Sequence, residues 1–219
     1  MLAVAVIGCG ALAGCGGGGS KSVATPDPGS AATATPNNGA ESTAIASSVA
    51  AHIETALPQA ADVPAALSQA ARGVQIVAPN DFPGQSVQAS LATAQFGGEN
   101  TSEFLKAALI VPDTGGPTPL MDAFTPQTYL QGLTANPQGS ADPVAVTGGP
   151  PGARSFRFTG DLSATGATEQ LTGEVLAFVH GKVFVLLVHG NYTATAAGVD
   201  LVALASLIDT RLAALPDAN

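Results

Sequence analysis

Hydrophobic and polar positions form their clearest pattern in the last third of the chain, where they predict three β-strands followed by a helix. The strands are expected over residues 154–160, 170–179 and 182–192. Over residues 199–215, apolar residues recur at three- and four-residue spacing, which indicates an amphipathic helix. Its apolar stripe consists of Leu201, Leu204, Ala205, Ile208, Leu212 and Leu215. The chain is therefore expected to end in antiparallel strands with a helix packed on them.

The second and third of these strands are close enough in sequence to form a hairpin. A two-residue turn at His180-Gly181 would place Thr172 opposite His189, with Glu174 as a diagonal neighbour of His189. A three-residue turn over residues 180–182 would change this pairing. One face then carries Val175, Ala177, Val179, Phe184, Leu186 and Val188, and the other carries Leu176, Phe178, Val183, Val185 and Leu187. Because both faces are apolar, helices, other strands or a ligand must cover the sheet on both sides.

Two helices are predicted in the first half of the chain. Apolar residues recur every fourth position over residues 41–57, which indicates a helix that Pro58 ends. Its stripe consists of Ile45, Val49, Ile53 and Leu57. A second, short helix is expected to begin with Asp62 at its N-cap and Pro64 in its first turn.

The middle of the chain predicts more strands. Residues 73–78 and 86–96 are expected to be strands, while residues 103–111 fit either a strand or a helix. Thr125 and Pro126 predict the start of a further helix, because threonine is a good N-cap and proline fits the first helical position. Residues 136–152, rich in proline and glycine, are expected to form an exposed loop.

Composition narrows the range of partners. The chain has 7 lysines and arginines against 16 aspartates and glutamates, giving a formal net charge of -9. Such a chain repels phosphate-rich molecules, so nucleic acid is not expected as a partner. Alanine, glycine and proline dominate, and tryptophan is absent, which leaves little material for an aromatic binding platform.

The N-terminus carries the strongest indication of location. Residues 1–14 are mostly apolar but too few to span a bilayer as a helix. Leu12-Ala13-Gly14-Cys15 resembles the lipobox of bacterial lipoproteins, which implies that residues 1–14 are a signal peptide and that Cys15 is lipidated. Val6-Ile7-Gly8-Cys9 also fits, although it leaves almost no apolar core upstream, and no lysine or arginine precedes the apolar run. An ordinary cleaved signal or a short anchor stays open as an alternative, as does a structural segment of the fold.

The segment behind Cys15 is expected to be a disordered tether. Residues 15–40 consist largely of glycine, serine, threonine, alanine and proline, which cannot bury enough apolar surface to offset the entropy of ordering. The chain is therefore expected at the cell membrane, lipid-anchored on the extracytoplasmic face, with a single domain over residues 41–219. The part up to about residue 72 is expected to be helical.

Candidate chemistry is sparse. Glu174 and His189 form a candidate ligand-binding or acid–base pair, because a carboxylate can orient an imidazole, and a third ligand would let the pair hold a metal. The alternative is a structural polar pair at the solvated end of the sheet. The sequence contains no G-x-S-x-G or H-E-x-x-H motif. No catalytic residue, cofactor or metal site is therefore assigned.

The order of elements resembles the PsbP-like α-β-α sandwich found in actinobacterial envelope lipoproteins of the mycobacterial type. The resemblance is strongest from Gly181-Lys182-Val183-Phe184-Val185-Leu186 into residues 201–215. It implies an α+β fold in which helices cover an antiparallel sheet, and an accessory or binding role. The expected function is a lipid-anchored module that binds an envelope protein or an apolar small molecule. The alternatives are a hydrolase or metal enzyme using Glu174 and His189, and a passive surface antigen or spacer.

Overall fold

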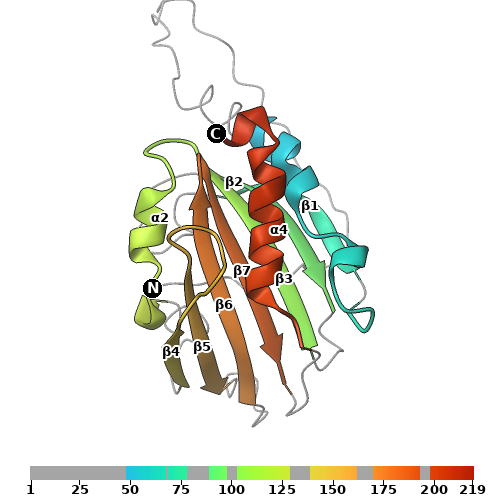
Figure 1. The fold of residues 1–219 in the computed structure, drawn as a ribbon, viewed down its shortest axis with the longest axis vertical. Coiled ribbons are helices and arrows are strands. Elements are labelled where there is room, and N and C mark those ends of the chain that lie inside the picture. Colours follow the sequence, from blue (N-terminus) through green and yellow to red (C-terminus); the bar gives the residue numbers. More distant parts are fainter. Residues whose placement is uncertain are drawn as a thin grey trace, which may run out of the picture.

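The computed structural model describes residues 48–67, 69–77, 89–97, 103–128, 139–161, 170–192 and 198–219. The predicted signal peptide and tether lie outside the described residues. The described part is a seven-stranded antiparallel sheet with helices on both faces, which confirms the predicted α+β class (Figure 1).

The elements have the following bounds. The strands are β1 (Gln69–Val77), β2 (Ala89–Phe96), β3 (Glu103–Pro112), β4 (Gly139–Val144), β5 (Arg154–Asp161), β6 (Gln170–His180) and β7 (Val183–Asn191). The α-helices are α2 (Thr118–Ala123) and α4 (Leu201–Ala213), and the 3-10 helices are η1 (Glu54–Ala56), η2 (Ala60–Asp62) and η5 (Pro216–Ala218). Residues 48–53 and 126–128 are also helical.

The sheet consists of two meanders joined in its middle. The strand order is β1-β2-β3-β7-β6-β5-β4, and every neighbouring pair is antiparallel. β1 to β3 and β4 to β7 each pair in sequence order, and the two groups meet where β3 pairs with β7. The C-terminal hairpin therefore occupies the centre of the sheet, with β1 and β4 at its edges (Figure 1).

One core layer lies between the sheet and α4, which crosses the face of the sheet that is turned to the viewer in Figure 1. The predicted stripe of α4 is buried except for Leu215, which is partly buried. Residues 48–57 pack into the same layer through Ala50, Ile53, Ala56 and Leu57. From the sheet the layer receives Ala92, Ala94, Phe96, Leu105, Ala107, Leu109, Val111, Leu176, Phe178, Val183, Val185 and Leu187.

A second core layer lies on the opposite face, where α2 contributes Met121. Its other buried members are Ala89, Leu91, Ile110, Phe124, Phe156, Phe158, Leu171, Val175, Ala177, Phe184 and Val188. Phe124 stacks on Phe156 with ring centroids 4.7 Å apart. The assignment of hairpin residues to two faces is thus confirmed, and helices contribute to both layers.

The predicted hairpin register is wrong by two residues. The turn is Gly181-Lys182, so that His180 pairs with Val183 and Glu174 lies directly opposite His189. Gly181 has a φ of 51°, and two-residue hairpin turns require a positive φ at their first central position. A shift of two residues keeps every side chain on its face, which is why the face assignment survives.

Other predictions hold in part. Residues 103–111 lie in strand β3, and β1 starts at Gln69, inside the segment expected to be helical. The prediction that Asp62 begins a helix is wrong. Asp62 instead ends η2, and its carboxylate accepts a hydrogen bond from the Gln59 N–H at 2.7 Å. The expected loop over residues 136–152 contains β4, and α2 was not predicted. Thr125 caps the helical residues 126–128, since its hydroxyl oxygen accepts the Thr128 N–H at 3.2 Å.

Candidate functional site

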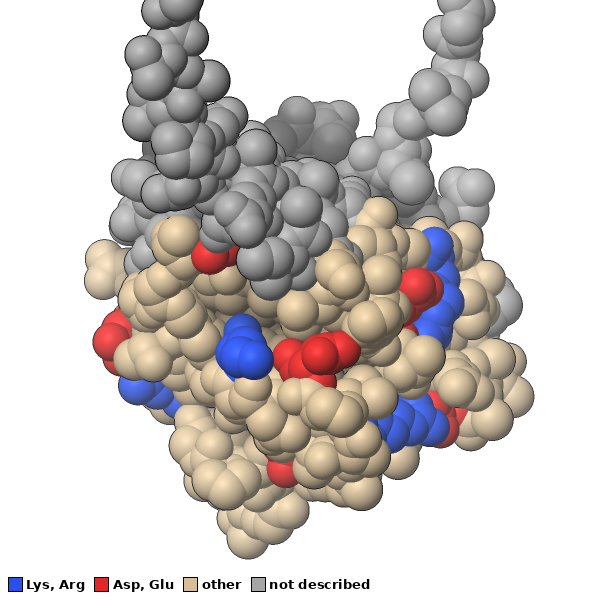
Figure 2. Space-filling view, turned by 90° about the horizontal axis from the view of Figure 1, so that it is seen from above, with Lys and Arg blue, Asp and Glu red and all other residues tan. Residues whose placement is uncertain are grey.

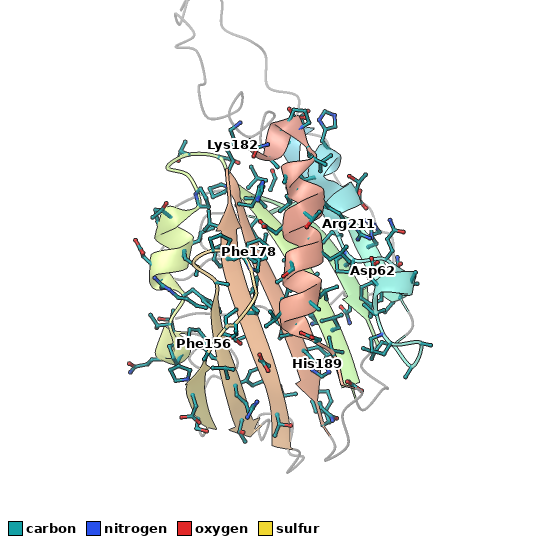
Figure 3. The ribbon with its side chains drawn as sticks, viewed as in Figure 1. Asp62, Phe156, Phe178, Lys182, His189 and Arg211 are labelled. Carbon is teal, nitrogen blue, oxygen red and sulfur yellow. The ribbon has the colours of Figure 1, made fainter. Side chains whose placement is uncertain are left out.

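The α4-facing side of the sheet changes from apolar to polar toward the end where α4 begins. There the strands place Arg157 opposite Glu174, Glu174 opposite His189, and Asn191 opposite Glu103. Directly opposed residues share a face, so these side chains belong to one group. We call Ser155, Arg157, Glu174, His189, Asn191 and Glu103 the polar end of the sheet. Figure 3 shows His189 at this end of the molecule.

The two residues singled out from the sequence lie side by side, but their hydrogen bonds go to other partners. His189 Nε2 lies 2.5 Å from Glu103 Oε1. The Ser155 hydroxyl lies 2.9 Å from Glu174 Oε1 and 3.0 Å from the Val175 carbonyl oxygen. The polar end therefore contains two linked pairs, Glu103 with His189 and Ser155 with Glu174, instead of one predicted pair.

Burial distinguishes the two pairs. The side chains of His189 and Glu103 are only 11% and 10% exposed. Glu174 is half-buried and Arg157 is exposed. The Glu103–His189 contact also bridges β3 and β7, which is the junction of the two meanders. Its position fits a structural link between the halves of the sheet.

The other two histidines contact carboxylates as well. His180 Nδ1 lies 2.7 Å from Asp209 Oδ1 and joins β6 to α4. His52 Nδ1 lies 2.5 Å from Asp217 Oδ2 and joins the helical residues 48–53 to η5, in a solvent-exposed position. Within the described residues, no group of three or more His, Cys, Asp or Glu side chains is arranged to hold a metal ion.

A further polar contact, between Arg211 and Asp62, fixes the N-terminal helical part to α4. Arg211 donates two hydrogen bonds to the Asp62 carboxylate, at 2.8 Å and 3.0 Å, and a third to the Leu57 carbonyl at 3.2 Å. The Arg211 guanidinium holds the pKa of Asp62 below its usual value, because it stabilises the charged carboxylate. Figure 3 shows the two labelled residues on neighbouring elements.

A groove adjoins this ion pair. It has a volume of about 270 Å³ and lies between η2 and the start of α4. Its lining consists of Asp62, Pro64, Gly198, Val199, Asp200, Ala203, Leu204 and Leu207. Both carboxylates in this lining already have partners, Arg211 for Asp62 and the Ala203 N–H for Asp200. The groove therefore offers mainly apolar surface.

Charge is sparse on the outer surface in view. Figure 2 shows the end of the molecule at the top of Figure 1, where blue and red groups are scattered and several lie next to each other. No large patch of one sign is visible among the described residues on this side. In the described part of the chain, no helix is both long and apolar enough to cross a bilayer.

Comparisons with known proteins do not identify a family. No family model matches the chain, and no curated protein matches it. Among solved structures, the chain is similar to an uncharacterised protein (Rv0999 ortholog) from Mycobacterium smegmatis, at 12% sequence identity and a TM-score of 0.39. The match covers 78% of this chain and 96% of that chain. A likeness this weak leaves the function to be argued from the chain's own residues.

Proposed function

We propose that the chain is a lipid-anchored envelope lipoprotein whose domain is a non-catalytic binding module for another envelope protein. The observation that carries the proposal is the lipobox-like Leu12-Ala13-Gly14-Cys15, followed directly by a glycine-rich segment. Acyl chains on Cys15 would hold the protein at the membrane, since each buried methylene contributes about 0.8 kcal/mol. The α-β-α arrangement suits a PsbP-like accessory domain on the extracytoplasmic face.

The packing under α4 favours a protein partner over an apolar small molecule. Phe178, Val185, Leu187 and Ile208 meet between the sheet and α4, and all four have 0% exposure. Side chains without surface open to water have no water-sized void beside them, so an apolar ligand would have to displace α4 to enter this layer. A partner would instead bind the outer surface of the domain.

The arrangement of the polar end favours binding over catalysis. A general base must reach the proton that it removes, whereas His189 is buried and already engaged with Glu103. Glu174 is engaged with Ser155. We therefore assign Glu103 and His189 a structural role, and keep the half-buried Glu174 as the candidate ligand contact of the pair predicted from the sequence.

The anchor is tested with Cys15→Ser in the native host. We expect the variant to leave the membrane fraction or to stay as an uncleaved precursor, and to lack the mass of the lipid, because serine offers no thiol for acylation. Cys9→Ser is the matched control and should keep both membrane partitioning and mass. Unchanged partitioning and mass in Cys15→Ser would contradict the proposal, as would lipid loss in Cys9→Ser alone.

Native mass spectrometry of the protein extracted from its own envelope tests the binding role. A retained second protein supports the binding module. A lipid retained in addition to the anchor would instead favour a carrier. A protein that consistently carries neither would favour a passive spacer. Each of the last two results overturns the protein-binding part of the proposal without affecting the anchor.

A further inference from the structure

We propose that a partner protein binds an exposed row of charges on the α4 side of β4, β5 and β6, through a helix that carries one acidic side chain between two basic ones. The row consists of Asp142, Arg157 and Glu174, and we call it the charged row. The proposal rests on the proposed function, because it names the surface and the partner chemistry through which the domain would bind another envelope protein.

The charged row runs straight across three strands. Arg157 on β5 lies directly opposite Asp142 on β4 and directly opposite Glu174 on β6. Opposed residues share a face of the sheet, and Glu174 shares its face with Leu176, which lies in the layer under α4. Asp142 and Arg157 are exposed and Glu174 is half-buried. Figure 1 shows β4, β5 and β6 beside the start of α4, with no described helix in front of their lower parts. The row is therefore open to a partner.

Arg157 differs from the other arginines of the described residues because its guanidinium is free. The side chains of Arg72, Arg154 and Arg211 each donate hydrogen bonds within the domain. Within the part of the chain that the structure describes, the Arg157 side chain makes no hydrogen bond and no ion pair. Its N–H groups can therefore donate to a carboxylate of a partner in the bidentate geometry that arginine favours. Arginine is also among the residues that contribute most to protein–protein binding.

The two carboxylates beside Arg157 determine which charges the partner must present. A purely acidic partner surface would face Asp142 and Glu174 as well as Arg157, and like charges in contact cost binding free energy. An acidic group between two basic groups instead gives each residue of the row an opposite charge. A second copy of this chain is a poor partner for the row, because two molecules with a formal charge of -9 repel each other.

The spacing of the row fits a helix of the partner better than a strand. Neighbouring strands lie about 4.8 Å apart, so the row extends over about 10 Å from Asp142 to Glu174. Side chains four positions apart on a helix are separated by about 5 to 6 Å, whereas side chains on one face of a strand recur at about 6.6 Å. We therefore expect basic, acidic and basic side chains at positions i, i+4 and i+8 of a partner helix.

The test compares two labelled helical peptides for binding to the full chain, extracted from its host in detergent. Both peptides are alanine-rich and have the same composition, with lysine, glutamate and lysine at successive i+4 positions in the first and lysine, lysine and glutamate in the second. Their net charges are equal, so general attraction to an acidic chain is the same for both. By fluorescence anisotropy, we expect the first peptide to bind about tenfold more tightly, and this preference to weaken at high salt. Equal affinities would overturn the proposal.

Arg157→Glu tests the centre of the row. It should abolish the preference, because both peptides then make two favourable contacts and one unfavourable contact. Lys182→Glu, the same change of charge at an exposed position, is the matched control and should keep the preference. Figure 3 shows Lys182 at the end of the molecule opposite His189. Thermal unfolding checks that each variant folds, and Asp142→Lys, which also equalises the two peptides, serves if Arg157→Glu does not fold.

The outcomes separate the charged row from the proposed function. A preference that persists in a folded Arg157→Glu or Asp142→Lys variant would overturn the assignment of the row. A second protein retained in native mass spectrometry, together with equal affinities for the two peptides, would leave the binding role standing and overturn the charged row as its surface.

Discussion

At the scale of single residues, the few charged side chains mainly fasten separate segments to one another. Only 11% of the residues are charged, yet the ion pairs of Arg72 and Arg211 both hold the N-terminal helical part onto the rest of the domain. Arg154 donates to the Met121 carbonyl at 2.7 Å and so ties β5 to α2. These charged side chains join separate elements, while the core layers between the elements are apolar.

The Asp62–Arg211 pair predicts a pH-dependent part of the stability. The folded-state pKa of Asp62 lies below its unfolded value, so the pair stabilises the fold above the unfolded pKa, about 4, and this contribution is lost as the pH falls through the folded pKa. Because the contact is bidentate and the Asp62 side chain is only 14% exposed, we expect the pair to contribute about 1 kcal/mol to the free energy of unfolding. Ion pairs that are screened by solvent contribute little.

The measurement is urea unfolding at pH 7 and between about pH 4 and pH 2, followed by circular dichroism. Asp62→Asn should be less stable than the parent at pH 7, and the difference should shrink as the pH falls through this window. Asp142→Asn, at an exposed position, is the control and should follow the parent throughout. A stability difference for Asp62→Asn that stays constant with pH would contradict the assignment.

Single-residue placement was predictable only where contacts are local. Strand alternation put Glu174 and His189 on one face, and the structure places them opposite each other. Glu103 could not be found in the same way, because it lies 86 positions from His189 and reaches it only through the pairing of β3 with β7. The sequence around Glu103 contains no feature that selects one distant strand over another.

At the scale of elements, the turn between β6 and β7 shows how closely the last residues are fitted to the hairpin. A Cβ on Gly181 would collide with the Ala218 carbonyl oxygen, and Gly181 has a φ of 51°. The Lys182 N–H also donates to that carbonyl at 2.9 Å. The turn and η5 are therefore packed against each other through their backbones, with no space for a side chain at position 181.

Gly181→Ala is expected to destabilise the protein by about 2 kcal/mol or more. About 1 kcal/mol comes from the left-handed backbone, and the rest comes from the displacement of η5. Gly73→Ala is the matched control, because a Cβ there meets nothing within 4 Å and the strand conformation suits alanine. Urea titration gives the free energy of unfolding of each variant, and we compare the two values with that of the parent. Equal stabilities for the two variants would show that η5 does not restrict the turn.

Whether an element could be predicted depended on how its burial is patterned. β6 and β7 are long and lie in the middle of the sheet, so continuous apolar runs mark them over residues 175–179 and 183–188. β4 is exposed at most positions and includes Pro143, so only its pairing with β5 makes it a strand. The six residues of α2 are too few to show a helical period. Elements without a hydrophobic period of their own were therefore missed.

At the scale of the whole molecule, one sheet supports two core layers. β6 and β7 send alternate side chains to each side, Leu176 and Leu187 toward α4 and Val175 and Val188 toward α2. The same strands position both layers, so we expect loss of packing in one layer to weaken the other. The two layers are thus expected to unfold together as one cooperative unit.

This coupling is tested with one cavity in each layer. Ile208→Ala, in α4, should cost about 3 kcal/mol, and Val175→Ala, on the opposite face of β6, about 2 kcal/mol, since both side chains are fully buried. Each variant should still unfold in a single calorimetric transition, with a midpoint lower than that of the parent. The double variant should lose the sum to within about 0.5 kcal/mol, because the sites share no contact across the sheet. Two separate transitions, with Ile208→Ala shifting one and Val175→Ala the other, would show that the layers fold independently. The central hairpin would then be a boundary between two units and not the shared support of one.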